Sequence, residues 1–182
     1  MKMTVRNVRL SFVALLEPKA VKAGDKPAYS AALLLAPTDP QVAAINAAML
    51  EAAKAKWGAK GETMFKTLKA GDKLALHNGD SKAQYAGFEG NMFISARNQA
   101  KPALKHRDGR TDVTEAGVLY SGCYANAVLE FWAQDNNYGK RINATLLGVQ
   151  FVKDGESFGG GGGRAADEDF DELSMDEGDD LM

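Results

Sequence analysis

Cysteine and histidine are almost absent from this chain. Cys123 is the single cysteine among 182 residues, so no intramolecular disulfide can form, which suits a reducing compartment. His77 and His106, the two histidines, are 29 positions apart, and with one cysteine they cannot build a zinc cluster of Cys and His ligands. The carboxylates outside the C-terminal region are scattered. The sequence therefore predicts neither a metal site nor a cofactor.

Long apolar segments are missing as well. The longest purely apolar run, residues 31–36, is far shorter than a membrane span, and the residues after Met1 do not resemble a signal peptide. No internal repeat is present. We expect a cytoplasmic protein that has no contact with a membrane.

The fingerprints of nucleotide-dependent enzymes are also lacking. Five consecutive glycines occupy residues 159–163, but the Lys-Ser/Thr pair of a phosphate-binding loop does not follow them, so the run indicates a flexible hinge. We expect no enzymatic activity. A nuclease that uses an Asp/Glu metal site is the catalytic alternative.

Charge is divided unequally along the chain. Residues 154–182 hold 11 of the 24 acidic residues and one of the 22 basic residues, which leaves 13 acidic and 21 basic residues in 1–153. The body therefore carries about +8 and the C-terminal region about −10, although the net charge is −2. This asymmetry is typical of a nucleic-acid-binding surface joined to an acidic arm.

The hydrophobic pattern predicts a mainly β domain with a helix inserted early. Asp39 and Pro40 are suited to begin the helix and Gly58 to end it, and 63–68 is a candidate for a second, shorter helix. Lys19, Lys22 and Lys26 lie in a basic loop between the first two strands. The predicted strands are 5–16, 29–35, 73–77, 91–98, 118–133 and 141–153. Such an order favours a small barrel, with an immunoglobulin-like sandwich as the alternative.

Binding to single-stranded nucleic acid needs positive charge for phosphates and aromatic rings for unpaired bases. The predicted strand 118–133 alternates with period two, and its apolar phase, which includes Cys123, should face the core. The other phase carries Tyr120 and Tyr124 on either side of Gly122 and ends at Trp132. We interpret the two tyrosines as a stacking platform, with half-buried sheet tyrosines as the alternative.

Other basic and aromatic residues extend this surface. Phe93 and Arg97 share one face of the strand 91–98, and the loops supply further aromatic and basic side chains. The alternative for Phe93 is that it packs in the core. The alternative for the basic loop residues is that they are exposed to solvent and bind no ligand. The full set of predicted DNA contacts is Tyr120, Tyr124, Phe93, Arg97, Tyr138, Lys140, Arg141, Tyr85, Phe88, Lys101, Lys105, Arg107 and Arg110.

The acidic end of the chain is low in apolar residues, so we expect 158–182 to be a glycine hinge followed by a disordered tail, and 1–157 to be the folded domain. Such a tail can reach its own domain, compete with DNA for the basic groove, and recruit partner proteins. A simple solubility tail is the alternative. The residues predicted to bind a partner are Asp176, Glu177, Asp179, Asp180, Leu181 and Met182.

The whole chain, most specifically its last third, resembles a bacteriophage family of OB-fold single-stranded DNA-binding proteins, once known as a domain of unknown function. The resemblance rests on Leu129-Glu130-Phe131-Trp132, on Tyr138-Gly139-Lys140-Arg141-Ile142-Asn143 and on 148–155. It implies an antiparallel OB-fold-like barrel of about five strands or more with an inserted α-helix. It also implies a role in phage DNA replication and recombination in the cytoplasm of a bacterial host.

The expected function is therefore sequence-independent binding and protection of single-stranded DNA. Its tail would contact replication or recombination proteins, although it ends in Leu-Met where many bacterial tails end in Pro-Phe. The oligomeric state is open, with a homodimer as one possibility, and so is the choice between DNA and RNA. The functional alternatives are a strand-annealing recombination protein and an adaptor that does not bind DNA.

Overall fold

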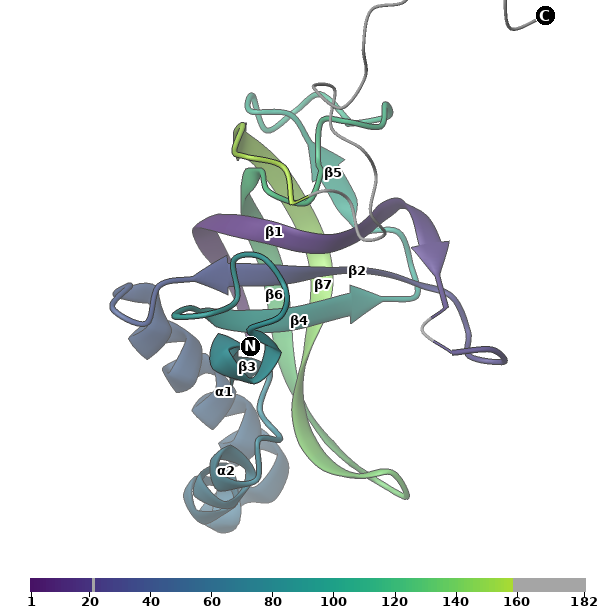
Figure 1. Cartoon of the computed structure of the whole chain (residues 1–182). Helices are drawn as coiled ribbons and strands as arrows, with labels where there is room; N and C mark the ends of the chain where they lie inside the picture. The colour runs from purple at the N-terminus through teal and green to yellow at the C-terminus, as the bar shows by residue number, and fades with distance from the viewer. Residues whose placement is uncertain (21, 159–182) are drawn as a thin grey trace, which may run out of the picture.

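The computed structural model describes residues 1–20 and 22–158 (Figure 1). The predicted hinge and acidic tail from 159 onward lie outside the described residues. The strands are β1 (Lys2–Lys19), β2 (Ala28–Leu35), β3 (Leu76–Asn78), β4 (Met92–Asn98), β5 (Ala103–Lys105), β6 (Tyr124–Asn136) and β7 (Gly139–Lys153). The helices are α1 (Gln41–Trp57), η1 (Gly58–Lys60), α2 (Gly61–Ala70) and η2 (Gly79–Lys82).

Five of the strands close into a barrel. The sheet order is β3-β4-β2-β1-β6-β7-β5, and a short parallel pairing between β4 and β7 joins the two sides of the ring. The other contacts around the ring are antiparallel. Counting barrel strands alone, the spatial order is 1-2-3-5-4, the connectivity of an OB-fold. The predicted barrel is confirmed, and the sandwich alternative is wrong because one sheet closes on itself.

The barrel core follows the predicted alternation. Ala125, Ala127, Leu129 and Phe131 of β6 are buried, while the residues between them are less so. Cys123 is buried directly before the strand, and burial raises the pKa of its thiol. The cysteine is therefore an inert core residue rather than a reactive one.

The strand that we predicted over 118–133 begins later, at Tyr124. Gly122 adopts φ 116, and a Cβ there would lie 2.2 Å from the carbonyl oxygen of Glu156, so only glycine fits. Its N–H donates to the carbonyl of Leu10, which pins the turn against β1. Tyr120 therefore precedes the strand, and the prediction that it shares a strand face with Tyr124 is wrong.

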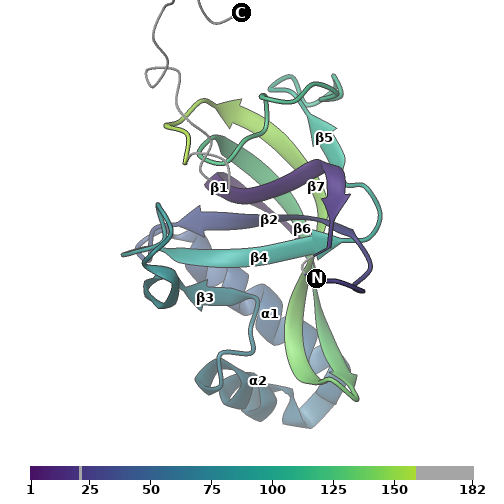
Figure 2. The ribbon, with the colours of Figure 1, turned by 45° about the vertical axis from the view of Figure 1, so that its right-hand side comes forward.

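Both predicted helices form, and they pack together outside the barrel (Figure 2). Asp39 supports the start of α1, because its carboxylate accepts a hydrogen bond from the N–H of Gln41 at 2.9 Å. At the other end of α1, the indole N–H of Trp57 donates to the carboxylate of Asp135 on β6 at 3.0 Å. This bond connects the helix to the long β6–β7 hairpin, which extends beyond the barrel.

The segment that we predicted as a loop between 98 and 117 contains one further strand, β5. It pairs in parallel with β7, with Leu104 opposite Val149. Three residues give too short a pattern to be recognised in the sequence. β5 and the tip of the β6–β7 hairpin lie at opposite ends of the barrel (Figure 1). No helix in the described ranges is both long and apolar enough to cross a bilayer.

Candidate nucleic-acid interface

The outer face of β4 provides the floor of the candidate site. Ile94 and Ala96 point into the barrel core, whereas Phe93, Ser95 and Arg97 point outward, as the alternation predicts. The outward positions of β4 pair in register with Leu34, Ala32 and Ser30 of β2. This surface of β2 and β4 is the face that OB-folds commonly use to bind oligonucleotides.

A groove of about 670 Å³ lies between β4 and the β6–β7 hairpin. Its walls come from β4, from the segment around β3, and from the hairpin. The lining residues are Leu74, Ala75, His77, Ser95, Arg97, Asn98, Gln99, Trp132, Gln134, Arg141, Ile142, Asn143, Ala144 and Thr145. None of these lining residues is acidic.

Two arginines give the groove its charge. Arg97 is exposed on β4, and Arg141 is half-buried on β7. Neither takes part in any of the ion pairs found among residues 1–20 and 22–158. Both guanidinium groups are therefore available to phosphate oxygens, which they can bind in bidentate fashion.

Trp132 supplies an aromatic surface to the same groove. It is 43% exposed and lies opposite Asn143 in the hairpin register. The predicted DNA contacts did not include it, although it ends the outward phase of β6, and that phase was the signal that could have identified it. Tyr138 is 91% exposed in the two-residue turn between Asn136 and Gly139.

Three of the four amide side chains in the groove are hydrogen-bonded within the protein, and only that of Gln99 has no such bond among the described residues. Asn143 donates to Gln134 at 2.8 Å, and Asn98 donates to the carbonyl of Leu146 at 3.0 Å. Base-specific readout would need such donors and acceptors to face the bases. The groove is better suited to contacts with phosphates and ring faces.

His77 closes the β3 side of the groove. Its Nδ1 lies 2.7 Å from the carboxylate of Asp72, and its ring stacks on Phe93 with centroids 5.1 Å apart. These two contacts fix the orientation of the imidazole. The sequence pattern predicted no role in binding for His77.

The loop from Tyr85 to Gly90 folds back over the outer face of β2 and β4. Phe88 is 1% exposed and packs on Phe93, which is 3% exposed, with centroids 5.1 Å apart. Phe88 was predicted as a DNA contact, but its ring is buried because it fills the space above Leu34 and Phe93. Phe93 is itself buried in this cluster on the outer face of the sheet, which agrees with the alternative that it is a packing residue. Tyr85 alone in this loop keeps an exposed ring, at 41%.

The two tyrosines around Gly122 are both engaged. The hydroxyl of Tyr120 donates to the carboxylate of Asp154 at 2.8 Å and receives the N–H of Gly155 at 3.1 Å. Burial raises the pKa of Tyr120. Tyr124 lies between the cations of Arg9 and Lys153, at 5.6 and 4.7 Å from its ring centroid. Of the two tyrosines, Tyr124 is the one that combines an aromatic ring with nearby positive charge.

The basic loop after β4 is tied together by its own acidic residues. Lys105 forms an ion pair with Asp112, and His106 lies 3.2 Å from the carboxylate of Glu115. The side chain of Thr111 and the backbone N–H groups of Arg110 and Thr111 hold the pKa of Asp108 down at about 2. Lys105 is the last residue of β5, and Arg107 and Arg110 follow it in the chain, at the end of the barrel opposite the hairpin tip (Figure 1). Lys101 lies between β4 and β5.

Lys140 and Arg141 diverge although they are neighbours in the sequence. In the hairpin register Arg141 lies opposite Gln134 in the groove, whereas Lys140 lies opposite Asp135 on the other face. Of the predicted contacts, the structure thus brings Arg97 and Arg141 together in the groove, with Tyr138 at the hairpin tip.

The predicted partner-binding residues of the tail lie outside the described residues. No group of three or more potential metal ligands occurs in the described part of the chain.

Comparison with known proteins gives consistent results. A protein described as putative protein p50, from Acyrthosiphon pisum secondary endosymbiont phage 1, is 38% identical over 185 residues, covering 100% of this chain and 99% of that protein. The solved single-stranded DNA-binding protein of bacteriophage Enc34, in complex with ssDNA, is similar with 34% identity and a TM-score of 0.72, over 87% of this chain and 89% of that one.

A more distant structure shares the fold alone. The single-stranded DNA-binding protein gp2.5 of bacteriophage T7 is 9% identical, with a TM-score of 0.60, over 86% of this chain and 94% of that one. The family model described as "Enterobacter phage Enc34, ssDNA-binding protein" matches residues 1–182. With this match over its whole length, the chain belongs to the family of the Enc34 phage single-stranded DNA-binding protein.

Proposed function

We propose that this protein binds single-stranded DNA without sequence preference and protects it during phage DNA replication and recombination. The observation that carries the proposal is the groove between β4 and the hairpin, where Arg97 and Arg141 lie with the exposed Trp132. A related structure, the Enc34 protein, is solved in complex with ssDNA, which supports the same ligand here.

Binding would be passive and electrostatic in origin. Arg97 and Arg141 would hold phosphates and release counterions, so affinity should fall steeply with salt. Trp132 and Tyr138 would stack bases, which any base can satisfy. Since three of the four groove amides are engaged within the protein, little sequence preference is expected. Lys101, Lys140 and the basic loop would at most contact the strand outside the groove.

The acidic C-terminal region would compete with DNA for the groove and recruit replication or recombination proteins once DNA displaces it. Its charges follow from the sequence, where 158–182 contains nine acidic residues and one basic residue. Support for competition is this charge complementarity with the groove arginines. A chain that ends after Phe158 tests the competition, because residues up to that point pack on the domain and would be kept.

The proposal is tested by titrating labelled oligo-dT and a duplex of equal length at two salt concentrations. We expect preference for the single strand, weakening with salt, and a loss of affinity in the Arg97→Ala/Arg141→Ala variant. Lys60→Ala, an exposed lysine on η1 away from the groove, is the matched control. Equal affinity for duplex and single strand, or none for either, would overturn the proposal, and the second result would favour an adaptor.

Removing 159–182 should tighten single-strand binding at low salt if the tail competes. Unchanged affinity would be consistent with binding in the groove and would contradict competition by the tail.

Two further results would favour a different function. Rapid pairing of complementary strands would favour a strand-annealing protein, and magnesium-dependent cleavage would favour a nuclease.

A further inference from the structure

One aromatic residue of β1 is held in an unusual backbone conformation. Phe12 has φ 49, in the left-handed region that bulky residues rarely adopt. It lies where the register between β1 and β2 shifts, between Ser11 and Ala14, at a bulge. Strain of this kind is retained where the surrounding structure imposes it, and it is frequent at binding sites.

The bulge turns the ring of Phe12 onto a second aromatic residue. Its centroid lies 4.9 Å from that of Tyr85 with the planes at 87°, and 5.8 Å from that of Phe88. Phe88 is buried beneath and connects the pair to Phe93 on β4. Phe12 and Tyr85 themselves remain 43% and 41% exposed, so packing alone does not account for them.

The loop that carries Tyr85 is held in place by hydrogen bonds at both ends. The N–H of Tyr85 donates to the carbonyl of Lys82 at 3.0 Å, and Asp80 accepts the N–H of Gly90 at 2.8 Å. The ammonium of Lys82 lies 5.5 Å from the ring centroid of Phe93. The exposed pair is therefore preorganised, with a cation close by, which is the combination that a stacked base and its phosphate require.

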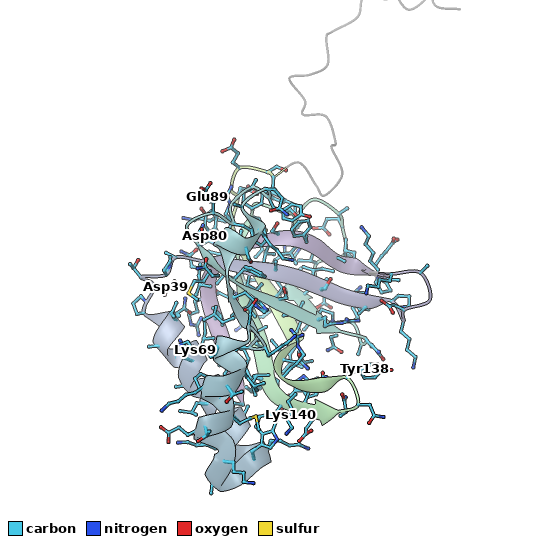
Figure 3. All side chains as sticks on the ribbon, turned by 60° about the horizontal axis from the view of Figure 1, so that its bottom comes forward. Asp39, Lys69, Asp80, Glu89, Tyr138 and Lys140 are labelled. Carbon is cyan, nitrogen blue, oxygen red and sulfur yellow. The ribbon has the colours of Figure 1, made fainter. Side chains whose placement is uncertain are left out.

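The pair and the groove occupy the same face of the sheet. Phe93, which lies below the aromatic cluster, and Arg97 both point outward from β4, about 13 Å apart at about 3.3 Å per residue. Between them Ser95 of β4 is exposed, whereas its register neighbours Ala32 of β2 and Ser11 of β1 are buried, and Phe158 packs against the cluster that contains Ala32. In Figure 3, Asp80 and Glu89 mark the loop at one end, and Tyr138 and Lys140 mark the hairpin tip at the other.

We propose that Phe12 and Tyr85 form a second base-stacking platform. A single strand would leave the groove at Arg97, pass the exposed Ser95 of β4 and stack on these two rings. The inference rests on the proposed function, since it extends the path of the same ligand. It assigns the strained bulge a role, namely to hold an aromatic ring on the face of the sheet.

The backbone conformation of Phe12 allows a substitution that removes the ring alone. Glycine accepts a φ of 49 without strain, so Phe12→Gly removes the ring without adding backbone strain. We expect affinity for a long oligo-dT to fall about 5- to 150-fold, the range for loss of one base–aromatic stack. Phe12→Trp should retain the affinity within about twofold. A short oligonucleotide confined to the groove should be weakened by Trp132→Ala and not by Phe12→Gly.

Two results separate the inference from the function on which it rests. If the wild-type protein does not bind oligo-dT, the proposed function fails. If the wild type binds, Trp132→Ala weakens binding, and folded Phe12→Gly binds every length as the wild type does, the second platform is overturned. Photo-crosslinking of wild-type protein to oligonucleotides that carry 5-iodouracil tests the same point without a variant. Crosslinks at Phe12 or Tyr85 are expected, and crosslinks confined to the hairpin would contradict the platform.

Discussion

The groove and the loop around β5 are both basic in the sequence, yet their charges are arranged differently in space. In the loop, Lys105 pairs with Asp112, and His106 lies beside Glu115. In the groove, Arg97 and Arg141 come from strands far apart in the chain and have no ion-pair partner among the described residues. A basic count therefore does not measure the charge that a ligand can reach, because nearby acids neutralise part of the loop's charge, although Arg107 and Arg110 take part in none of the ion pairs of the described residues.

The largest expected effect comes from removing both groove arginines. Arg97→Ala/Arg141→Ala should weaken oligo-dT binding more than about 150-fold at low salt, because each loses a charge-assisted contact of about 1.5–3 kcal/mol. The slope of log affinity against log salt should also become shallower by about 1.4, for two phosphates at about 0.7 each. Fluorescence titration over several salt concentrations measures both. A weaker affinity with an unchanged slope would contradict direct phosphate contact.

Removing the aromatic surface of the groove should have a somewhat smaller effect. Trp132→Ala should reduce affinity by about 1–3 kcal/mol, or about 5- to 150-fold, with the salt slope preserved. Trp132→Phe should recover most of the loss. Quenching of tryptophan fluorescence by oligo-dT provides a direct check in the wild type, where Trp57 is bonded to Asp135 away from the groove lining. No quenching would contradict stacking on Trp132.

The loop around β5 should tolerate the same charge removal. Lys105→Ala/Arg110→Ala changes the net charge as much as the groove double variant, yet we expect affinity to change less than about twofold near physiological salt. Because both double variants remove two positive charges, a difference in their affinities reports the position of the charges and not their number. A loss as large as that of the groove variant would show that the strand reaches the loop.

The smallest effect concerns the stability of the loop at acid pH. The pKa of Asp108 is lowered from 3.8 to about 2, so its ionised form stabilises the folded protein above about pH 4. This contribution should disappear as the pH falls from about 4 to about 2. Asp108→Asn should be less stable than the wild type at neutral pH, with the difference shrinking over this range in thermal unfolding. A difference independent of pH would contradict the assignment.

Much of the fold follows from local sequence patterns. The alternation in β4 and β6 identified the inward residues, and Asp39 with Pro40 located the start of α1. The start of β6 was predicted too early because apolar residues continue through 118–123. The strand does not extend back to 118 because Gly122 turns against Glu156, which is distant in the sequence. β5 is too short to produce a period of its own.

The site was predictable only in part, for a similar reason. Arg97, Arg141 and Tyr138 were identified from their strand face or turn. Trp132 ends the outward phase of β6, but the predicted DNA contacts do not include it. The burial of Phe88 depends on Leu34 and Phe93 beneath it, which no local pattern reveals. The role that we propose for Phe12 depends on its backbone conformation, which the sequence does not indicate.

The most direct test of the central claim is a hydrogen-exchange footprint of oligo-dT on the full-length protein. Binding in the groove predicts slower amide exchange in β4 and in the hairpin between Trp132 and Asn143, with little change in the loop between Lys105 and Asp112. Protection confined to that loop or to α1 and α2, with β4 and the hairpin unchanged, would contradict the groove as the binding site.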